Sequence, residues 1–165
     1  MFGEMRAAIS CPKSVDILEH VYAMSDSEQE VAMEAIRDVE RKAMTSQTPQ
    51  PGLLTLITYL EMHSLPMGIC TRNFDTPVAH LLKKFLAGSH FHPIVTRDFR
   101  PPKPHPAGIL HICEDWGVPP RAVLMVGDSV DDMTAGYRAG ATTVLLANDV
   151  NRHLVEVRIQ WLYGT

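Results

Sequence analysis

Apolar positions in the first fifty residues recur at helical spacing. Ser25 and Glu28 form a capping-box pattern at the start of a helix. In a capping box, each of the two side chains accepts the backbone N–H of the other residue. The stripe that follows repeats every three or four positions and comprises Ala32, Ala35, Ile36, Val39 and Ala43. A shorter helix precedes it, with Ser14 as the expected N-cap and apolar positions at Val15, Leu18 and Tyr22. The pattern predicts a small helical segment over residues 1–50.

From Gly52 onward, helical patterns alternate with short apolar runs. Helical spacing is expected over residues 53–60, 77–85, 106–116 and 131–139, and strand-like runs over 65–70, 94–95, 122–126 and 143–146. Such alternation predicts βαβ units, and therefore an α/β fold with a parallel sheet over residues 51–165. In parallel sheets, ligands bind at the carboxyl ends of the strands.

The charge changes at the same place as the pattern. Residues 1–50 hold 5 basic and 9 acidic side chains, whereas residues 51–165 hold 10 of each, so the whole net charge of −4 belongs to the first segment. The junction carries turn residues, namely Pro49, Pro51 and Gly52. We therefore expect two sub-regions, a helical segment 1–50 and an α/β core 51–165.

Composition excludes several classes of protein. Hydrophobic residues make up 45% and charged residues 21%, as in ordinary globular chains rather than disordered ones. An acidic balance argues against nucleic-acid binding, and no apolar run is long enough to predict a membrane span. Glu4 and Arg6 stand where a signal peptide would need apolar residues. The odd set of three cysteines favours reduced thiols and a cytoplasmic location.

The strongest chemical signal is the run Gly127-Asp128-Ser129-Val130-Asp131-Asp132 after an apolar strand. Three carboxylates within five residues repel one another, and a divalent cation offsets that repulsion. Oxygen ligands on a short turn suit Mg²⁺, which takes one or two carboxylates and keeps several waters. The alternative is that Asp131 and Asp132 are first-turn acids favoured by the helix dipole.

Two further patterns offer groups for an anion. Thr71, Arg72 and Asn73 follow a predicted strand and precede a helix, where hydroxyls and free backbone N–H groups suit an anionic oxygen. The alternative is a simple turn in which Thr71 and Asn73 act as caps. Lys103 lies among four prolines, which would fix the position of its amine. A proline-rich linker with a solvated lysine is the other interpretation.

Taken in order, these motifs resemble the haloacid dehalogenase superfamily, and in particular its phosphoglycolate-phosphatase-like hydrolases. Thr71 matches the second motif of that family, Lys103 in KPHP the third, and Asp128 with Asp132 in GDSVDDMTAG the fourth. The resemblance implies a Rossmann-like core with a helical cap over residues 1–50. It also implies a hydrolase that acts on a small phosphorylated metabolite with Mg²⁺.

The resemblance also implies a role for each matched residue. Thr71 would hydrogen-bond the transferring phosphoryl group, with Asn73 nearby as support. The phosphate would be bound by Thr71, Arg72, Asn73 and Lys103, of which Thr71 and Lys103 are the expected catalytic residues. Lys103 would balance charge between nucleophile and phosphate. Asp128 would hold Mg²⁺, and Asp132 would complete the acidic end of the site. Positioning and charge neutralisation are what phosphoryl transfer chiefly requires of a protein.

The first motif of the family, an Asp-x-Asp pair at the end of the first central strand, has no counterpart in these 165 residues. That motif supplies the nucleophile, so we expect a catalytically deficient chain whose first central strand is missing. Either the sheet closes up, another segment fills the place, or the chain is a fragment of a phosphatase. A non-catalytic regulatory module that binds phosphate and metal is the competing hypothesis.

Overall fold

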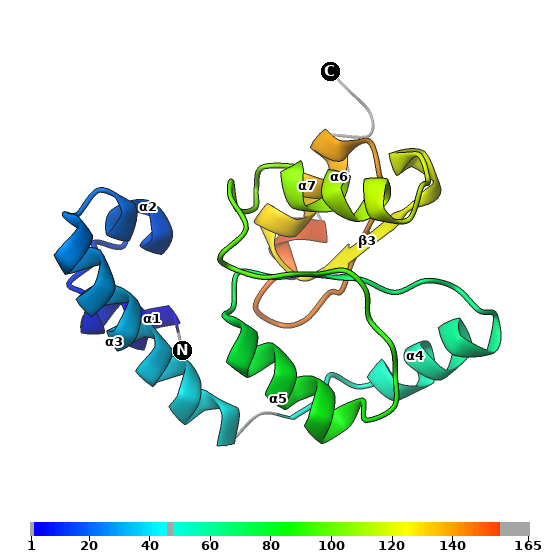
Figure 1. The fold of residues 1–165 in the computed structure, drawn as a ribbon, viewed down its shortest axis with the longest axis horizontal. Coiled ribbons are helices and arrows are strands. Elements are labelled where there is room, and N and C mark those ends of the chain that lie inside the picture. The colour runs from blue at the N-terminus through cyan, green and yellow to red at the C-terminus, as the bar shows by residue number, and fades with distance from the viewer. Residues whose placement is uncertain (1, 46–47, 156–165) are drawn as a thin grey trace. The chain divides into compact units, whose positions relative to one another are not determined.

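A computed structural model describes residues 2–45 and 48–155, which form parts of two compact units (Figure 1). Among the described residues, the first unit comprises 2–45, 48–57 and 74–89, and the second comprises 58–73 and 90–155. The grouping differs from the sequence-based division at residue 50, because the helix that follows Asn73 packs with the N-terminal helices. We describe each unit by itself.

In the part of the first unit that the structure describes, helices are the regular elements. Its helices are α1 (Phe2–Ala8), α2 (Ile17–Tyr22), α3 (Asp26–Thr45) and α5 (Asp75–Phe85). The expected cap of the short helix is wrong: Asp16, not Ser14, accepts the backbone N–H groups of Leu18 and Glu19. A carboxylate binds the helix N-terminus more favourably than a hydroxyl because it also interacts with the helix dipole. At α3, the Ser25 N–H donates to the Glu28 carboxylate over 3.0 Å, half of the predicted capping box.

The predicted apolar stripe of α3 forms the core of this unit. Ala32 and Ile36 are buried, and Ala35 and Val39 pack against them. The buried cluster comprises Met5, Ile9, Cys11, Ile17, Val21, Ala32, Ile36 and Phe74. The opposite face of α3 carries exposed ion pairs from Arg37 and Arg41. Helical spacing in the sequence therefore predicted which face of α3 is buried.

The second unit is α/β, as predicted. Its elements are β1 (Ile69–Cys70), β2 (Ile94–Val95), α6 (Ala107–Asp115), the 3-10 turn η1 (Pro120–Ala122), β3 (Leu124–Gly127), α7 (Val130–Ala139) and β4 (Thr142–Leu145). Another helix, α4 (Leu53–Met62), crosses the boundary between the units. Of the predicted strand 65–70, only the last two residues form a strand, because β2 offers just two partner residues.

The strands form two separate two-stranded parallel sheets. Ile69 lies opposite Ile94 in one sheet, and Leu124 lies opposite Thr142 in the other. Within the part of the chain that the structure describes, no strand pairing joins the two sheets. The alternative in which the sheet closes up by direct pairing of β1 with β3 is therefore wrong. Leu124, in β3, is 64% exposed although it is a large apolar residue.

Helix α7 packs on β3 and β4, and α6 packs against α7. Both helices lie in the same part of the second unit as β3 (Figure 1). A glycine permits the close approach of α7 to the strands. A Cβ atom at Gly136 in α7 would lie 2.5 Å from Thr143 Cγ2 and 3.0 Å from Met125 Cβ. The buried cluster beneath them comprises Ile109, Cys113, Val123, Ala135 and Ala139. No helix within residues 2–45 and 48–155 is long and apolar enough to cross a membrane.

Replacing Gly136 by alanine should test this packing. We expect Gly136→Ala to lower the free energy of unfolding by about 1–3 kcal/mol, because the added methyl group overpacks the contact with β3 and β4. Arg138→Ala, at an exposed position of the same helix, should change it by no more than about 0.5 kcal/mol. Urea denaturation followed by circular dichroism measures both. Equal stabilities of the two variants would contradict the close approach of α7.

Candidate functional site

The sequence-predicted site residues all belong to the second unit and follow the carboxyl ends of its strands. Thr71, Arg72 and Asn73 come after β1, Lys103 lies in the long loop after β2, and Asp128 follows β3 directly. Asp131 and Asp132 lie in the first turn of α7. Parallel strands place their carboxyl ends at one edge of each sheet, and side-chain contacts between the following loops join residues up to 59 positions apart.

Lys103 connects the end of β1 with the start of α7. Its Nζ donates to the Cys70 carbonyl over 2.6 Å and to Asp132 Oδ1 over 2.5 Å. The Lys103 and Asp132 side chains are only 10% and 9% exposed, so this is a nearly buried ion pair. An ammonium group has three N–H donors, and these two contacts leave the third for another acceptor. The sequence-based interpretation of Lys103 as a solvated linker residue is wrong.

Asp132 is held from both sides. Its Oδ2 accepts the backbone N–H groups of Asp128 and Ser129, each over 3.1 Å, and the Ser129 hydroxyl accepts the Asp132 N–H in return. Burial acts to raise the pKa of the Asp132 carboxyl, but the Lys103 ammonium and the hydrogen bonds from Lys103 and Ser129 outweigh it and hold that pKa below its usual range. Both carboxylate oxygens already accept hydrogen bonds, which favours a positioning role over direct binding of a metal.

Gly127 makes room for this carboxylate. A Cβ atom at position 127 would lie 2.5 Å from the Cβ, Cγ and Oδ2 atoms of Asp132. No side chain fits there without moving Asp132 away from Lys103. The glycine of the Gly-Asp-Ser run therefore has a steric reason to precede the acidic loop.

Asp128 presents its carboxylate to solvent. The residue is exposed, and within the described part of the chain its carboxylate has no ion-pair partner. Its backbone is fixed by Asn151, whose Nδ2 donates to the carbonyls of Asp128 (2.7 Å) and Leu146 (2.9 Å). Of the charges described so far, the Asp128 carboxylate is the one that remains without a neutralising cation.

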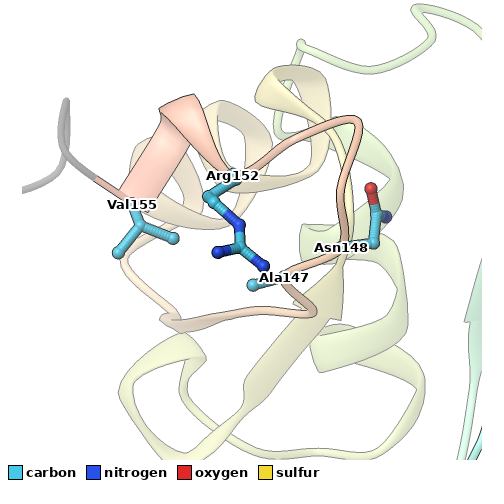
Figure 2. Close-up of a pocket in the computed structure, with 4 residues that line it drawn as sticks. All are labelled: Ala147, Asn148, Arg152 and Val155. Atoms are coloured by element: carbon cyan, nitrogen blue, oxygen red, sulfur yellow. The ribbon is translucent and has the colours of Figure 1, made fainter.

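Asn151 is a site residue that the sequence analysis missed. It is buried, and its Oδ1 accepts the Asn148 N–H over 2.6 Å. The pair of asparagines three positions apart is the available signal, since such side chains often fix a turn. A hollow of about 310 Å³ (Figure 2) is lined by Ala147, Asn148, Arg152 and Val155. None of the predicted site residues lines it.

The Thr71–Asn73 loop adopts the turn that was considered as an alternative. The Asn73 N–H donates to Thr71 Oγ1 over 3.1 Å, and the Thr71 N–H donates to the Val95 carbonyl over 2.8 Å. The turn does not exclude a binding role, because the hydroxyl still has its own proton to donate. The guanidinium of Arg72 pairs with the Asp131 carboxylate. The site thus offers an O–H donor at Thr71 and an N–H donor at Lys103.

Cys70 is not suited to act as a nucleophile. Burial raises the pKa of its thiol, partly opposed by the Lys103 ammonium, so the thiolate is scarce at neutral pH. The side chain packs beside the cluster under α6 and α7. Cys70 is therefore a half-buried packing residue rather than a nucleophile.

The site offers only one carboxylate for Mg²⁺, which is the smallest number of protein ligands that the ion uses. No group of three or more His, Cys, Asp or Glu side chains that could hold a metal occurs within residues 2–45 and 48–155. Mg²⁺ can bind through a single carboxylate if waters and phosphate oxygens complete its shell. Asp128 fits that requirement, because its carboxylate is exposed and has no partner in the described chain.

The curated proteins similar in sequence include two hydrolases and a phosphatase. The chain is 45% identical over 159 residues to an uncharacterized hydrolase of Saccharomyces cerevisiae, covering 94% of this chain and 73% of that protein. It is 37% identical over 142 residues to a haloacid dehalogenase-like hydrolase domain-containing protein of Arabidopsis thaliana, covering 86% and 57%. Phosphoglycolate phosphatase 1 of Pseudomonas aeruginosa is 27% identical over 129 residues, covering 78% and 47%. The chain thus spans only about half the length of the last two relatives.

Solved structures share the fold at low sequence identity. A haloacid dehalogenase hydrolase of family IA from Entamoeba histolytica matches with a TM-score of 0.73 and 20% identity, covering 93% of this chain and 78% of that one. A subfamily IA hydrolase from Geobacter sulfurreducens matches with a TM-score of 0.59 and 21% identity, covering 94% and 85%. Residues 5–146 match the haloacid dehalogenase-like hydrolase family itself. The chain therefore belongs to the haloacid dehalogenase-like hydrolases.

Proposed function

We propose that the strand ends of the second unit bind a phosphate monoester of a small metabolite together with Mg²⁺. The observation that carries the proposal is the nearly buried Lys103, which is fixed by the Cys70 carbonyl and Asp132 and retains one N–H donor. A fixed ammonium at the Cys70 carbonyl, one residue before the Thr71 hydroxyl, suits the negatively charged oxygens of a dianion. A phosphate monoester supplies such a cluster, and the phosphoglycolate phosphatase among the relatives is consistent with this class of substrate.

Each site residue then has a distinct task. Thr71 and Lys103 donate to the phosphate oxygens, and Asn73 supports the Thr71 turn. Asp128 holds Mg²⁺, which would neutralise charge on the phosphate when bound. Asp132 and Asn151 position other site residues, because Asp132 fixes the Lys103 ammonium and Asn151 fixes the Asp128 backbone.

Residues 1–165 by themselves should bind this ligand without turning it over, since they contain no Asp-x-Asp pair to accept the phosphoryl group. Two biological functions are compatible with such a chain. It is either the binding part of a phosphatase whose nucleophile strand lies in a further segment, or a non-catalytic module that responds to phosphate and Mg²⁺. Activity after addition of a strand that ends in Asp-x-Asp distinguishes them.

The three cysteines suit a reducing, intracellular environment. Cys11, Cys70 and Cys113 are free thiols, and two of them are buried. A cytoplasmic location is therefore part of the proposal, as is a small phosphorylated metabolite rather than a nucleic acid or a lipid surface.

Amide chemical-shift mapping tests the location of the ligand. In a ¹⁵N-labelled sample with Mg²⁺, inorganic phosphate should shift the amide resonances of Thr71, Asn73, Lys103 and Asp128 more than those of the first unit. Largest shifts at the hollow near Arg152, or uniformly small shifts, would overturn the proposed site.

Loss of the Asp128 carboxylate should remove the metal. We expect weak Mg²⁺ binding by the parent chain, because one carboxylate leaves most of the octahedral shell to water. Asp128→Ala should abolish the calorimetric signal, whereas Asp149→Ala, which removes a carboxylate that is 98% exposed, should leave it unchanged. Equal Mg²⁺ affinity in Asp128→Ala and the parent would exclude Asp128 as the ligand.

A further inference from the structure

The two sheets of the second unit are connected through side chains at the site. No strand pairing joins them within the described residues. Below the strand ends, α6 and α7 share an apolar cluster with Cys70 and Met125, which spans both sheets. At the strand ends themselves, two charged contacts cross from one sheet to the other. One is Lys103 with Asp132, and the second is Arg72 with Asp131.

The Arg72–Asp131 contact joins the loop after β1 to the first turn of α7. The two residues are 59 positions apart in sequence, and their side chains are 26% and 34% exposed. A partly shielded ion pair is screened less by salt than one on the open surface. The pair therefore couples the Thr71–Asn73 loop to the loop of Asp128 more firmly than an exposed salt bridge would.

Arg97 fixes the backbone from which Arg72 projects. Its Nε donates to the Arg72 carbonyl over 2.6 Å, and its backbone N–H donates to the Asn73 carbonyl over 3.0 Å. Arg97 is a buried residue, two positions after the end of β2. Two successive carbonyls of the loop are thus held by one residue, which restricts the direction in which the Arg72 side chain can extend.

We propose that Arg72 and Asp131 form a positioning pair, anchored by Arg97, that sets the distance between the phosphate-binding loop and the Mg²⁺-binding loop. This inference rests on the proposed function and changes the role of Arg72. The sequence analysis assigned Arg72 to direct phosphate binding, but its guanidinium is engaged by a carboxylate of the same site. The pair restricts the motion of the loop after β1 relative to the first turn of α7, whether or not a ligand is present.

Hydrogen exchange in the ligand-free chain tests the coupling directly. We expect Asp131→Asn to accelerate exchange of the Asn73 and Arg97 amides about tenfold, because the substitution releases Arg72 and with it the loop on the opposite sheet. Asp115→Asn removes a carboxylate that is 33% exposed, on α6, and should leave those amides unchanged. Exchange of the Met125 amide reports whether β3 stays folded. Unchanged exchange at Asn73 and Arg97 in Asp131→Asn would overturn the proposal.

Phosphate affinity distinguishes positioning from direct contact. A positioning pair predicts that Arg72→Gln and Asp131→Asn each weaken binding of inorganic phosphate, and that the double variant binds no more weakly than either single one. If Arg72 instead contacts phosphate, Asp131→Asn removes the carboxylate that competes with phosphate for its guanidinium and should tighten binding, which would overturn the proposal. Absence of phosphate binding by the parent chain contradicts the proposed function, whereas the exchange experiment still decides the role of the pair.

Discussion

Residues 1–165 alone should hydrolyse an aryl phosphate at least about 1,000-fold more slowly than the same chain extended at its N-terminus by a strand ending in Asp-x-Asp. The reason is chemical, because the site offers donors and a carboxylate for Mg²⁺ but no group that can accept the phosphoryl group. The separate sheets also leave the edges of β1 and β3 unpaired with one another, so an added strand has backbone groups to bind. Release of p-nitrophenol at saturating Mg²⁺ measures both rates.

The matched control carries the same extension with Asn-x-Asp. It should fold like the active extension but remain as slow as residues 1–165, because the amide cannot form the phosphoaspartyl intermediate that the family resemblance implies. If residues 1–165 alone show steady, Mg²⁺-dependent hydrolysis that Asp128→Asn abolishes, catalytic deficiency is contradicted.

Lys103→Met should lower the free energy of unfolding by about 3 kcal/mol, because it leaves the Asp132 carboxylate nearly buried without its cation. The Cys70 carbonyl loses its donor at the same time. Urea denaturation at neutral pH measures the change. Lys83→Met, at an exposed lysine of α5, serves as the control and should be close to neutral.

A second substitution separates the lost charge pair from lost packing. Asp132→Asn in the Lys103→Met background should restore most of the stability, since the amide oxygen can still accept the N–H groups of Asp128 and Ser129. A double variant as unstable as Lys103→Met alone would show that the ion pair does not account for the effect.

Local patterns predicted what depends on local physics. The stripe around Ile36 identified the buried face of α3, and the alternation of helices and strands identified the α/β class. The acidic run after β3 drew attention to Asp128, whose carboxylate is exposed and without a partner in the described chain. Each of these features follows from the spacing of residues within one element.

Contacts between segments that are distant in the sequence could not be predicted from sequence patterns. Nothing near Lys103 indicates that its amine reaches the Cys70 carbonyl, 33 positions away. Asp132 belongs to the same acidic run as Asp128. Its carboxylate oxygens, however, accept hydrogen bonds from Lys103 and from two backbone N–H groups. Asn151 and Arg97 bind backbone carbonyls of other loops. The asparagines at positions 148 and 151 indicate a turn but not these distant partners, and no pattern near Arg97 indicates its contact.

The strand ends are also where sequence-based boundaries failed. The apolar run 65–70 has strand-like composition, but only Ile69 and Cys70 find a partner in β2. Pairing, rather than propensity, decides how long a strand is. The length of β1 was therefore decided by a segment more than twenty residues further along the chain.

The central claim is that the strand ends bind phosphate, and calorimetric titration of inorganic phosphate in the presence of Mg²⁺ tests it most directly. The parent chain and Thr71→Ser, which keeps the hydroxyl, should bind with similar affinity. Thr71→Val keeps the shape but loses the donor to a charged oxygen, and should bind about tenfold more weakly. Failure of the parent to bind phosphate, or equal affinities of Thr71→Val and the parent, would contradict the account.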